Sequence, residues 1–179
     1  MKWRELLAAG AGQLNRIPKT LAITFAIGIA VIALAVAGVF YMQRGARMVL
    51  PGRVLKVRMA PLDENSSIAV IDFRVTNPAD YTFMAKEVTA VLEDSSGNQT
   101  EGETSSELDA QRVFAGIPLL GEKYNQSLKE RDQIPPHTTR DYMVASRFEV
   151  PEAKLTARKR FLVRIQEADG VVSEFAEQK

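Results

Sequence analysis

Residues 68–76 read Ile-Ala-Val-Ile-Asp-Phe-Arg-Val-Thr, and this stretch decides the fold class. Its apolar side chains recur at every second position, as they do on one face of a β-strand: Ala69, Ile71, Phe73 and Val75. The intervening Asp72, Arg74 and Thr76 would then face water. Asn77-Pro78 ends the pattern, because proline removes a hydrogen-bond donor from the ladder. The stretch therefore predicts a strand with one buried and one wet face.

The same alternation recurs along much of the chain beyond Pro51-Gly52. It is found in residues 54–59, 88–92, 141–150, 161–165 and 171–175. Turn-forming residues separate these strands, with hairpin signals at 94–98 and at Asp169-Gly170. Pro151 opens a helical turn over 151–159. Roughly six or seven short strands joined in this way predict a mainly β domain, a small antiparallel β-sandwich.

The stretch from about 103 to 131 interrupts this pattern as an insert. Within it, Ser106 is placed to cap a short helix that contains Leu108 and Val113, and Gly116 is placed to end that helix. Long loops in compact domains are commonly functional or mobile. We therefore expect a candidate partner surface in the insert, formed by Phe114, Ile117, Leu119, Leu120 and Tyr124.

An uncharged apolar run precedes the β domain, from Leu21 to Met42. A helix of this length is ~33 Å long, which is enough to cross the hydrocarbon core of a bilayer. A cleaved signal peptide is the alternative, since Ala35-Val36-Ala37 fits a cleavage site. The run continues beyond that point through Tyr41 and is longer than a signal peptide needs, so we expect a retained transmembrane helix with the lipid bilayer as its partner.

The apolar run divides the chain into four parts. These are a short basic tail (1–20), the transmembrane helix (21–42), a juxtamembrane linker (43–52) and the β-sandwich domain (53–179).

Basic residues on both sides of the apolar run bear on membrane orientation. The tail contains Lys2, Arg4, Arg16 and Lys19, but five more basic residues follow the run between 44 and 58. A short tail before one helix and a large domain is typical of a signal anchor. We therefore expect the C-terminal domain to lie outside the cytoplasm; the alternative is a domain at the inner face, with its basic collar on anionic lipid.

Composition excludes several kinds of chemistry. The chain has no cysteine, and therefore no disulfide, thiol nucleophile or thiolate metal site. Its formal net charge is +1, and the excess of basic residues lies in the tail, which gives no indication of a nucleic-acid partner. Residues 94–98 hint at a calcium loop, but position 105 is a serine where the closing glutamate of an EF-hand would stand. We expect no metal site and no cofactor.

Residues that could support catalysis are few. His137 is the only histidine, and the chain has neither a Gly-x-Ser-x-Gly nor a Ser-x-x-Lys motif. Asp72, Glu93 and Asp94 lie near the ends of predicted strands, where the acid pairs of glycosidases are found, but charged strand faces exposed to water explain them more simply. We expect no catalytic residues.

Three segments together resemble known families. They are Val70 to Pro78, which ends in Asn-Pro, then Tyr81 to Asp94, and the turn Ile134-Pro135-Pro136-His137-Thr138-Thr139. This pattern is similar to the late-embryogenesis-abundant type 2 (water-stress, WHy-like) domains and to the bacterial FxLYD-type domains. The resemblance implies an immunoglobulin-like or fibronectin-III-like sandwich without catalytic residues. It also implies a binding, protective or assembly role, often on a membrane-tethered chain.

These observations favour a single-pass membrane protein that carries a non-catalytic binding or assembly module. Its ligand or protein partner and its oligomeric state stay open. A stress-protective domain that works through weak contacts is the alternative hypothesis, and a hydrolase that uses His137 is the second alternative.

Overall fold

The computed structural model describes residues 18–43 and 48–178 and divides the chain into two compact units. Unit 1 is Met1–Arg47 and unit 2 is Met48–Lys179. The basic tail up to residue 17 and the arginines at 44 and 47 lie outside the described residues. Residues 48–52 of the predicted linker (43–52) belong to unit 2, and Gly52 is the first residue of β1.

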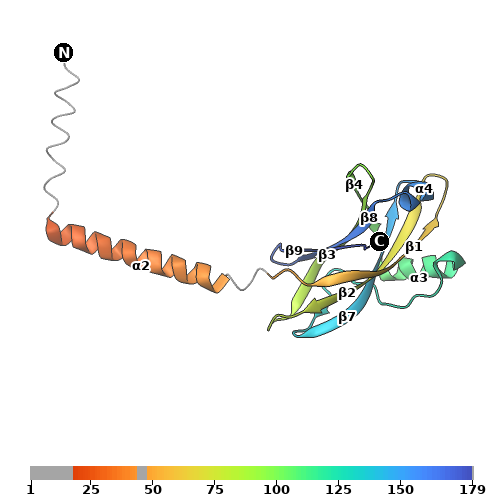
Figure 1. Ribbon diagram of the computed structural model, residues 1–179. Helices are drawn as coiled ribbons and strands as arrows, with labels where there is room; N and C mark the ends of the chain where they lie inside the picture. Colours follow the sequence, from red (N-terminus) through yellow and green to blue (C-terminus); the bar gives the residue numbers. More distant parts are fainter. Residues whose placement is uncertain (1–17, 44–47, 179) are drawn as a thin grey trace, which may run out of the picture. The chain divides into compact units, whose positions relative to one another are not determined.

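Helix α2 (Lys19–Gln43) is the regular element in the described part of unit 1, residues 18–43 (Figure 1). It begins after Pro18, whose carbonyl oxygen accepts hydrogen bonds from the backbone N–H groups of Leu21 and Ala22. The part from Thr20 to Tyr41 is long and apolar enough to cross a membrane, and within this unit none of its side chains is buried. The expectation of one apolar N-terminal helix is therefore confirmed, to within a residue at each end.

Unit 2 is mainly β. Its strands are β1 (Gly52–Pro61), β2 (Ser67–Asn77), β3 (Phe83–Glu93), β4 (Gln99–Glu101), β5 (Glu103–Thr104), β6 (Gln133–Ile134), β7 (Thr138–Phe148), β8 (Arg160–Glu167) and β9 (Val172–Ala176). Its helices are α3 (Glu107–Gly116), the single 3₁₀ turn η2 (Pro118–Leu120) and α4 (Glu152–Thr156).

These strands form two sheets in which the named strands pair antiparallel (Figure 1). Sheet one has the order β1-β2-β7-β5, and sheet two has the order β4-β3-β8-β9, with β6 pairing to β3. The long strand predicted at 68–76 is β2, and it lies between β1 and β7 at the centre of sheet one. The predicted antiparallel, mainly β architecture is thus confirmed.

The main core lies between the two sheets. Aromatic rings join the layers: the centroid of Phe73 on β2 is 6.1 Å from that of Phe175 on β9, and Phe148 on β7 is 5.7 Å from Phe161 on β8. The other buried side chains of this core include Ala69, Ile71, Val75, Phe83, Val88, Ala90, Leu92, Val144, Val163 and Ile165. The inward face that alternation predicted for β2 is therefore the face that packs here.

Gly102 allows the chain to pass from one sheet to the other. It lies between β4 of sheet two and β5 of sheet one, and its position leaves no room for a side chain. A Cβ atom at this position would lie 2.6 Å from Cζ of Phe148. The crossing therefore requires glycine because the chain passes directly over a core ring.

Alternation fails in β1, where a β-bulge lies between Val54 and Lys56. A bulge adds a residue to one strand and moves later side chains to the other face. Val54, Val57 and Met59 consequently pack against the core, while Leu55 is exposed. Alternation over residues 54–59 places Leu55, Val57 and Met59 on one face, and this is correct for the last two residues only.

Asn77 fixes one end of the two sheets. Its fully buried Nδ2 donates to the carbonyl oxygens of Tyr81 and Ile134, both at 2.9 Å, and to that of Pro135 at 3.2 Å. Its Oδ1 accepts a hydrogen bond from the backbone N–H of Ala79 at 3.0 Å. One side chain thus joins the end of β2 to the turn that opens β7.

We expect Asn77→Asp to lower the free energy of unfolding by about 3 kcal/mol, because an ionised carboxylate would face carbonyl oxygens that now accept hydrogen bonds. Urea denaturation of the full chain in detergent, followed by circular dichroism, measures this. Asn65→Asp, in an exposed turn, is the matched control and should change stability by less than about 0.5 kcal/mol. A cost below about 1 kcal/mol at position 77 would show that this network does not hold the turn.

Candidate functional site

The insert covers the outer face of sheet one as a packed layer. Sheet one contributes Ala60, Ile68, Val70, Met143 and Ala145 to a second buried apolar cluster, and the insert contributes Ala110, Val113, Phe114, Ile117 and Leu120. This cluster is separate from the core between the sheets. The outer face of β2, which alternation predicted to be wet, is therefore largely covered.

Helix α3 forms as its sequence predicts. Ser106 is the N-cap, and its Oγ accepts a hydrogen bond from the backbone N–H of Asp109 at 3.2 Å. The helix ends at Gly116, and the N–H of the next residue, Ile117, donates to the carbonyl of Val113. The cap and the end predicted at Ser106 and Gly116 are confirmed.

A buried ion pair lies where the insert meets sheet one. Arg58 of β1 is 8% exposed and Asp72 of β2 is 3% exposed, and Nη2 of the arginine lies 2.7 Å from Oδ2 of the aspartate. The other guanidinium nitrogen, Nη1, donates to the backbone carbonyls of Leu120 at 2.7 Å and Glu122 at 2.6 Å. Asn125 donates to Oδ1 of Asp72 at 2.8 Å. Both members of the pair therefore bind the insert as well as each other.

Two aromatic rings of the insert pack on the same guanidinium. The Cζ atom of Arg58 lies 4.9 Å from the ring centroid of Phe114 and 5.4 Å from that of Tyr124. Lys56, two residues earlier in β1, places its Nζ 5.6 Å from the ring of Tyr124. Cations at these distances from a ring face attract it. The Tyr124 ring, although 63% exposed, therefore packs against two cations of β1.

Glu107 joins the two halves of the insert. Its Oε1 accepts hydrogen bonds from Lys123 at 2.6 Å and from Gln111 at 3.1 Å, and its Oε2 accepts one from the backbone N–H of Ser127 at 3.1 Å. Burial raises the pKa of Glu107, but the hydrogen bonds from Lys123 and Ser127 outweigh it and lower that pKa to about 2. The carboxylate is therefore ionised at neutral pH and ties α3 to residues 123–127.

The five residues of the predicted partner surface differ in their exposure. Leu120 is 0% exposed and points into the second cluster, so its inclusion in a contact surface was wrong. Phe114 and Ile117 are partly buried against the same cluster. Leu119 is 78% exposed and Tyr124 is 63% exposed. The candidate surface therefore consists of Leu119 and Tyr124, held in place by residues beneath them.

Sequence reasoning missed the residues that position this surface: Arg58, Asp72, Glu107, Lys123 and Asn125. One signal was available. An insert rich in apolar side chains must bury them somewhere, and opposite charges at Arg58 and Asp72 lie on the same outer face of neighbouring strands.

Two of the residues considered for catalysis, His137 and Asp94, are turn residues. His137 has a φ of 52° in the turn before β7, and its Nε2 lies 2.9 Å from Oδ1 of Asp80, with both side chains exposed. Asp94 accepts hydrogen bonds from the backbone N–H groups of Ser96 and Asn98, as a turn residue does.

Asp72 and Glu93, two carboxylates that were expected to lie on strand faces exposed to water, are instead buried. Asp72 pairs with Arg58, and the buried Glu93 pairs with Lys159 at 2.6 Å and Arg160 at 2.7 Å. Hydrogen bonds from Lys159 and then Arg160 lower the pKa of Glu93. Each carboxylate thus neutralises a strand-borne cation.

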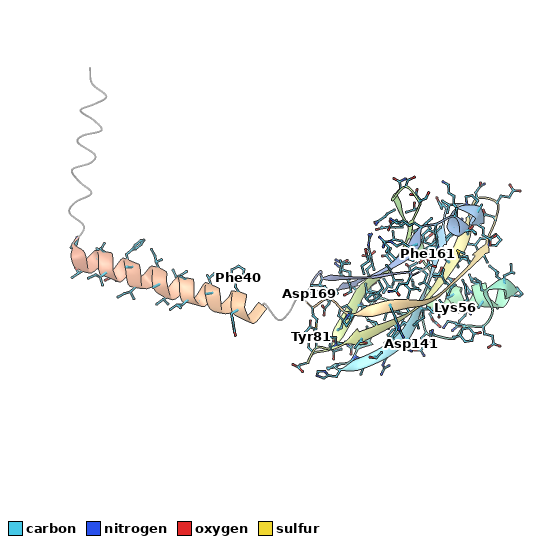
Figure 2. The ribbon with its side chains drawn as sticks, viewed as in Figure 1. Phe40, Lys56, Tyr81, Asp141, Phe161 and Asp169 are labelled. Carbon is cyan, nitrogen blue, oxygen red and sulfur yellow. The ribbon has the colours of Figure 1, made fainter. Side chains whose placement is uncertain are left out.

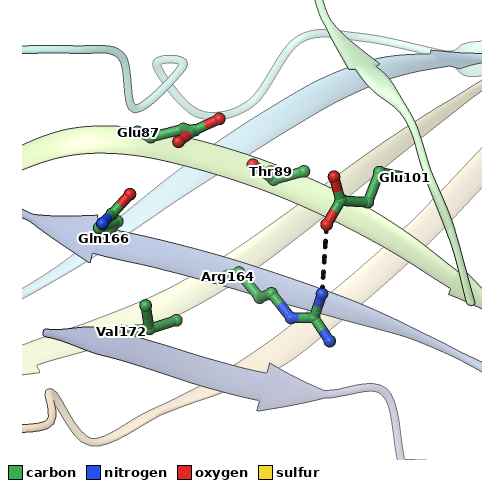
Figure 3. A pocket seen from close by; sticks show the side chains of 6 residues that line it. All are labelled: Glu87, Thr89, Glu101, Arg164, Gln166 and Val172. Atoms are coloured by element: carbon green, nitrogen blue, oxygen red, sulfur yellow. Dashed lines mark hydrogen bonds and ion pairs between the residues drawn. The ribbon is translucent and has the colours of Figure 1, made fainter. Parts of the chain in front are cut away.

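A shallow polar pocket of about 190 Å³ lies on the outer face of sheet two (Figure 3). Its lining residues are Glu87, Thr89, Glu101, Arg164, Gln166 and Val172. Arg164 donates to Glu101 at 3.3 Å, to Glu174 at 2.7 Å and to Gln99 at 2.6 Å, so each of its nitrogens already has an acceptor. In the described ranges 18–43 and 48–178, no cluster of three or more histidine, aspartate or glutamate side chains is arranged to hold a metal ion.

Comparison with known proteins leaves the chain without a family. No family model matches it, and no curated protein matches it. It is similar to the X-ray structure of Northeast Structural Genomics Consortium target SoR45, with 9% identity over 72% of this chain and 79% of that chain and a TM-score of 0.32. It is also similar to a crystal structure described as the ApaA protein from Bordetella pertussis, with 11% identity over 73% of this chain and 90% of that chain and a TM-score of 0.33. Likenesses this weak carry no argument about fold type or function.

We expect Arg58→Met to lower the free energy of unfolding by roughly 3–5 kcal/mol, because it leaves Asp72 buried without its cation and frees two carbonyls of the insert. Chemical denaturation measures the loss. The control is Arg74→Met, which removes the partly exposed pair with Asp141 on the same sheet and should cost less than about 1 kcal/mol. Equal losses in the two variants would contradict a special role for Arg58.

Proposed function

We propose that this chain is a membrane-anchored, non-catalytic binding or assembly module whose partner contacts Leu119 and Tyr124. The exposure of these two large side chains, on an insert whose apolar cluster packs on sheet one, is the observation that carries the proposal. The fold type in the proposal is an immunoglobulin-like or fibronectin-III-like sandwich of the LEA type 2 or FxLYD kind. The Asn77 network supports it, since the resemblance to those families rests on an asparagine turn at the end of β2.

Rigidity supports binding at this surface. Association is weakened when it must order mobile side chains, and tyrosine is enriched among residues that dominate interface energies. The ring of Tyr124 already packs against Lys56 and Arg58, which restricts its movement. Leu119 lies in η2, and the next residue of that turn, Leu120, is buried. A partner that covers Leu119 and Tyr124 therefore gains apolar contact at a small cost in conformational entropy.

The anchor and orientation belong to the same proposal. Helix α2 has the length and composition to hold the module at a membrane. The C-terminal module would lie outside the cytoplasm, in line with the basic residues of the short tail that precedes the helix. Its partner would then be a component of the cell surface or envelope.

Catalysis has little support in the candidate residues. The His137–Asp80 pair is exposed on both sides, and water can exchange freely around it. Asp72 and Glu93 are each paired with arginine or lysine, which keeps them from sharing a proton with a substrate. A non-catalytic role requires none of these residues to act on a substrate.

The absence of cysteine allows a direct test by site-specific cross-linking. Leu119→Cys and Tyr124→Cys, each labelled with a maleimide photo-cross-linker in native membranes, should give one and the same adduct. The control is Val172→Cys on β9, which is also exposed but lies on sheet two, and it should not give that adduct.

Adding Tyr124→Ala to the Leu119→Cys chain should reduce the adduct about tenfold or more, because an interface tyrosine commonly contributes 1.4 kcal/mol or above, roughly a factor of ten. An adduct that forms equally from position 172, or that is unchanged by Tyr124→Ala, would refute the choice of surface.

A further inference from the structure

Glu167 is a buried carboxyl group without a counterion at the end of β8. It is 6% exposed and follows Ile165 on the inward face of the strand. Among the described residues, its Oε2 is buried and has no hydrogen-bond partner. Buried carboxylates are normally paired or protonated, because an isolated charge is poorly solvated inside a protein. Figure 2 labels two titratable residues near Glu167, Tyr81 and Asp169.

The charged group that acts on the pKa of Glu167 is itself an acid, Asp169. Burial raises the pKa of Glu167 first, and the nearby carboxylate of Asp169 raises it further. Burial also raises the pKa of Tyr81, as do Glu167 and Asp169. Lys86 and Glu87 of β3 are exposed, and so is Arg131, whose backbone N–H bonds to Ala85. Asp132 next to it is partly exposed, and its Oδ2 accepts a hydrogen bond from the backbone N–H of Lys129.

Glu167 also lies at the base of the β8–β9 hairpin. Its backbone N–H donates to the carbonyl of Val171 at 2.8 Å, and the N–H of Gly170 donates to the carbonyl of Glu167 at 2.9 Å. Two residues beyond Val171, Ser173 of β9 accepts a hydrogen bond at its Oγ from the N–H of Leu50 at 2.8 Å. The hairpin therefore holds the segment by which the chain enters unit 2.

We propose that the Glu167 carboxyl makes the β8–β9 hairpin a proton-dependent latch, closed when Glu167 is neutral and open when it is ionised. Opening brings the carboxylate to water, where its charge is solvated and lies farther from Asp169. Because the hairpin holds Leu50, the protonation state of Glu167 sets how firmly the start of the domain is attached to sheet two.

The direction of the pH dependence follows from the raised pKa in the closed state. Below the ordinary glutamate pKa of about 4.5 both states are protonated, and the latch is fully stable. Above that value the open state is ionised while the closed state still holds its proton, so the closed state loses stability as pH rises toward the closed-state pKa; above the closed-state pKa both states are ionised and the loss is complete. The equilibrium constant for opening rises by up to about tenfold per pH unit between these two pKa values.

Amide hydrogen exchange of the full chain in detergent, measured from pH 4 to pH 8, tests the latch. After division by the intrinsic exchange rate, the protection of Glu167 and Gly170 should fall with pH in the wild type by up to about tenfold per unit. It should be independent of pH in Glu167→Gln. The control Glu87→Gln, an exposed carboxyl on neighbouring β3, should keep the wild-type slope.

Two outcomes would overturn the proposal. One is an identical slope in the wild type and Glu167→Gln. The other is an equal loss of protection in β2 and in the hairpin, which would make the effect one of global stability rather than of a local latch. If Glu167→Gln does not fold, Glu167→Met, which removes the carboxyl altogether, is measured in its place.

Discussion

The buried guanidinium of Arg58 is the constraint on which the outer layer depends. A charge in this position must find both a counterion and acceptors for its remaining N–H groups. Asp72 on the adjacent strand supplies the counterion and accepts one hydrogen bond from Nη2, and the carbonyls of Leu120 and Glu122 accept two from Nη1; among the described residues, Nε has no acceptor. Displacing the insert would therefore leave the two hydrogen bonds of Nη1 unmade inside a buried cation.

In this arrangement, the residues that form the main core are largely distinct from the residues that form the candidate partner surface. The core between the two sheets contains no residue of α3 or η2; it is built mainly by the strands, with Leu50, Leu128 and, from α4, Leu155. The insert adds a third layer, which buries Leu120 and exposes Leu119 one residue earlier. Two neighbouring residues of one short turn thus have different roles: Leu120 fixes the turn to the sheet, and Leu119 is available to a partner.

Local patterns in the sequence predicted much of the scaffold. Alternation found the long strands, Asn77-Pro78 ended β2, and Ser106 and Gly116 bounded α3, because each of these depends on neighbours in sequence. The outer layer could not be predicted in the same way. The alternation of apolar and polar residues places Arg58 and Asp72 on a face exposed to water. Alternation is a local pattern, and it carries no information that residues 120–125, distant in sequence, cover that face. Leu120 was misplaced for the same reason, and the bulge at Leu55 arose from pairing with β2 rather than from composition.

A double-mutant cycle between Arg58 and Asp72 tests the central claim most directly. The free energies of unfolding of Arg58→Met, Asp72→Leu and the double variant are measured against the wild type in the same detergent. If the buried pair holds the insert on sheet one, the double variant will be more stable than the sum of the single losses implies, with a coupling of about 2 kcal/mol or more. Losses that add to within about 0.5 kcal/mol would show that the two residues act independently, and would contradict the account.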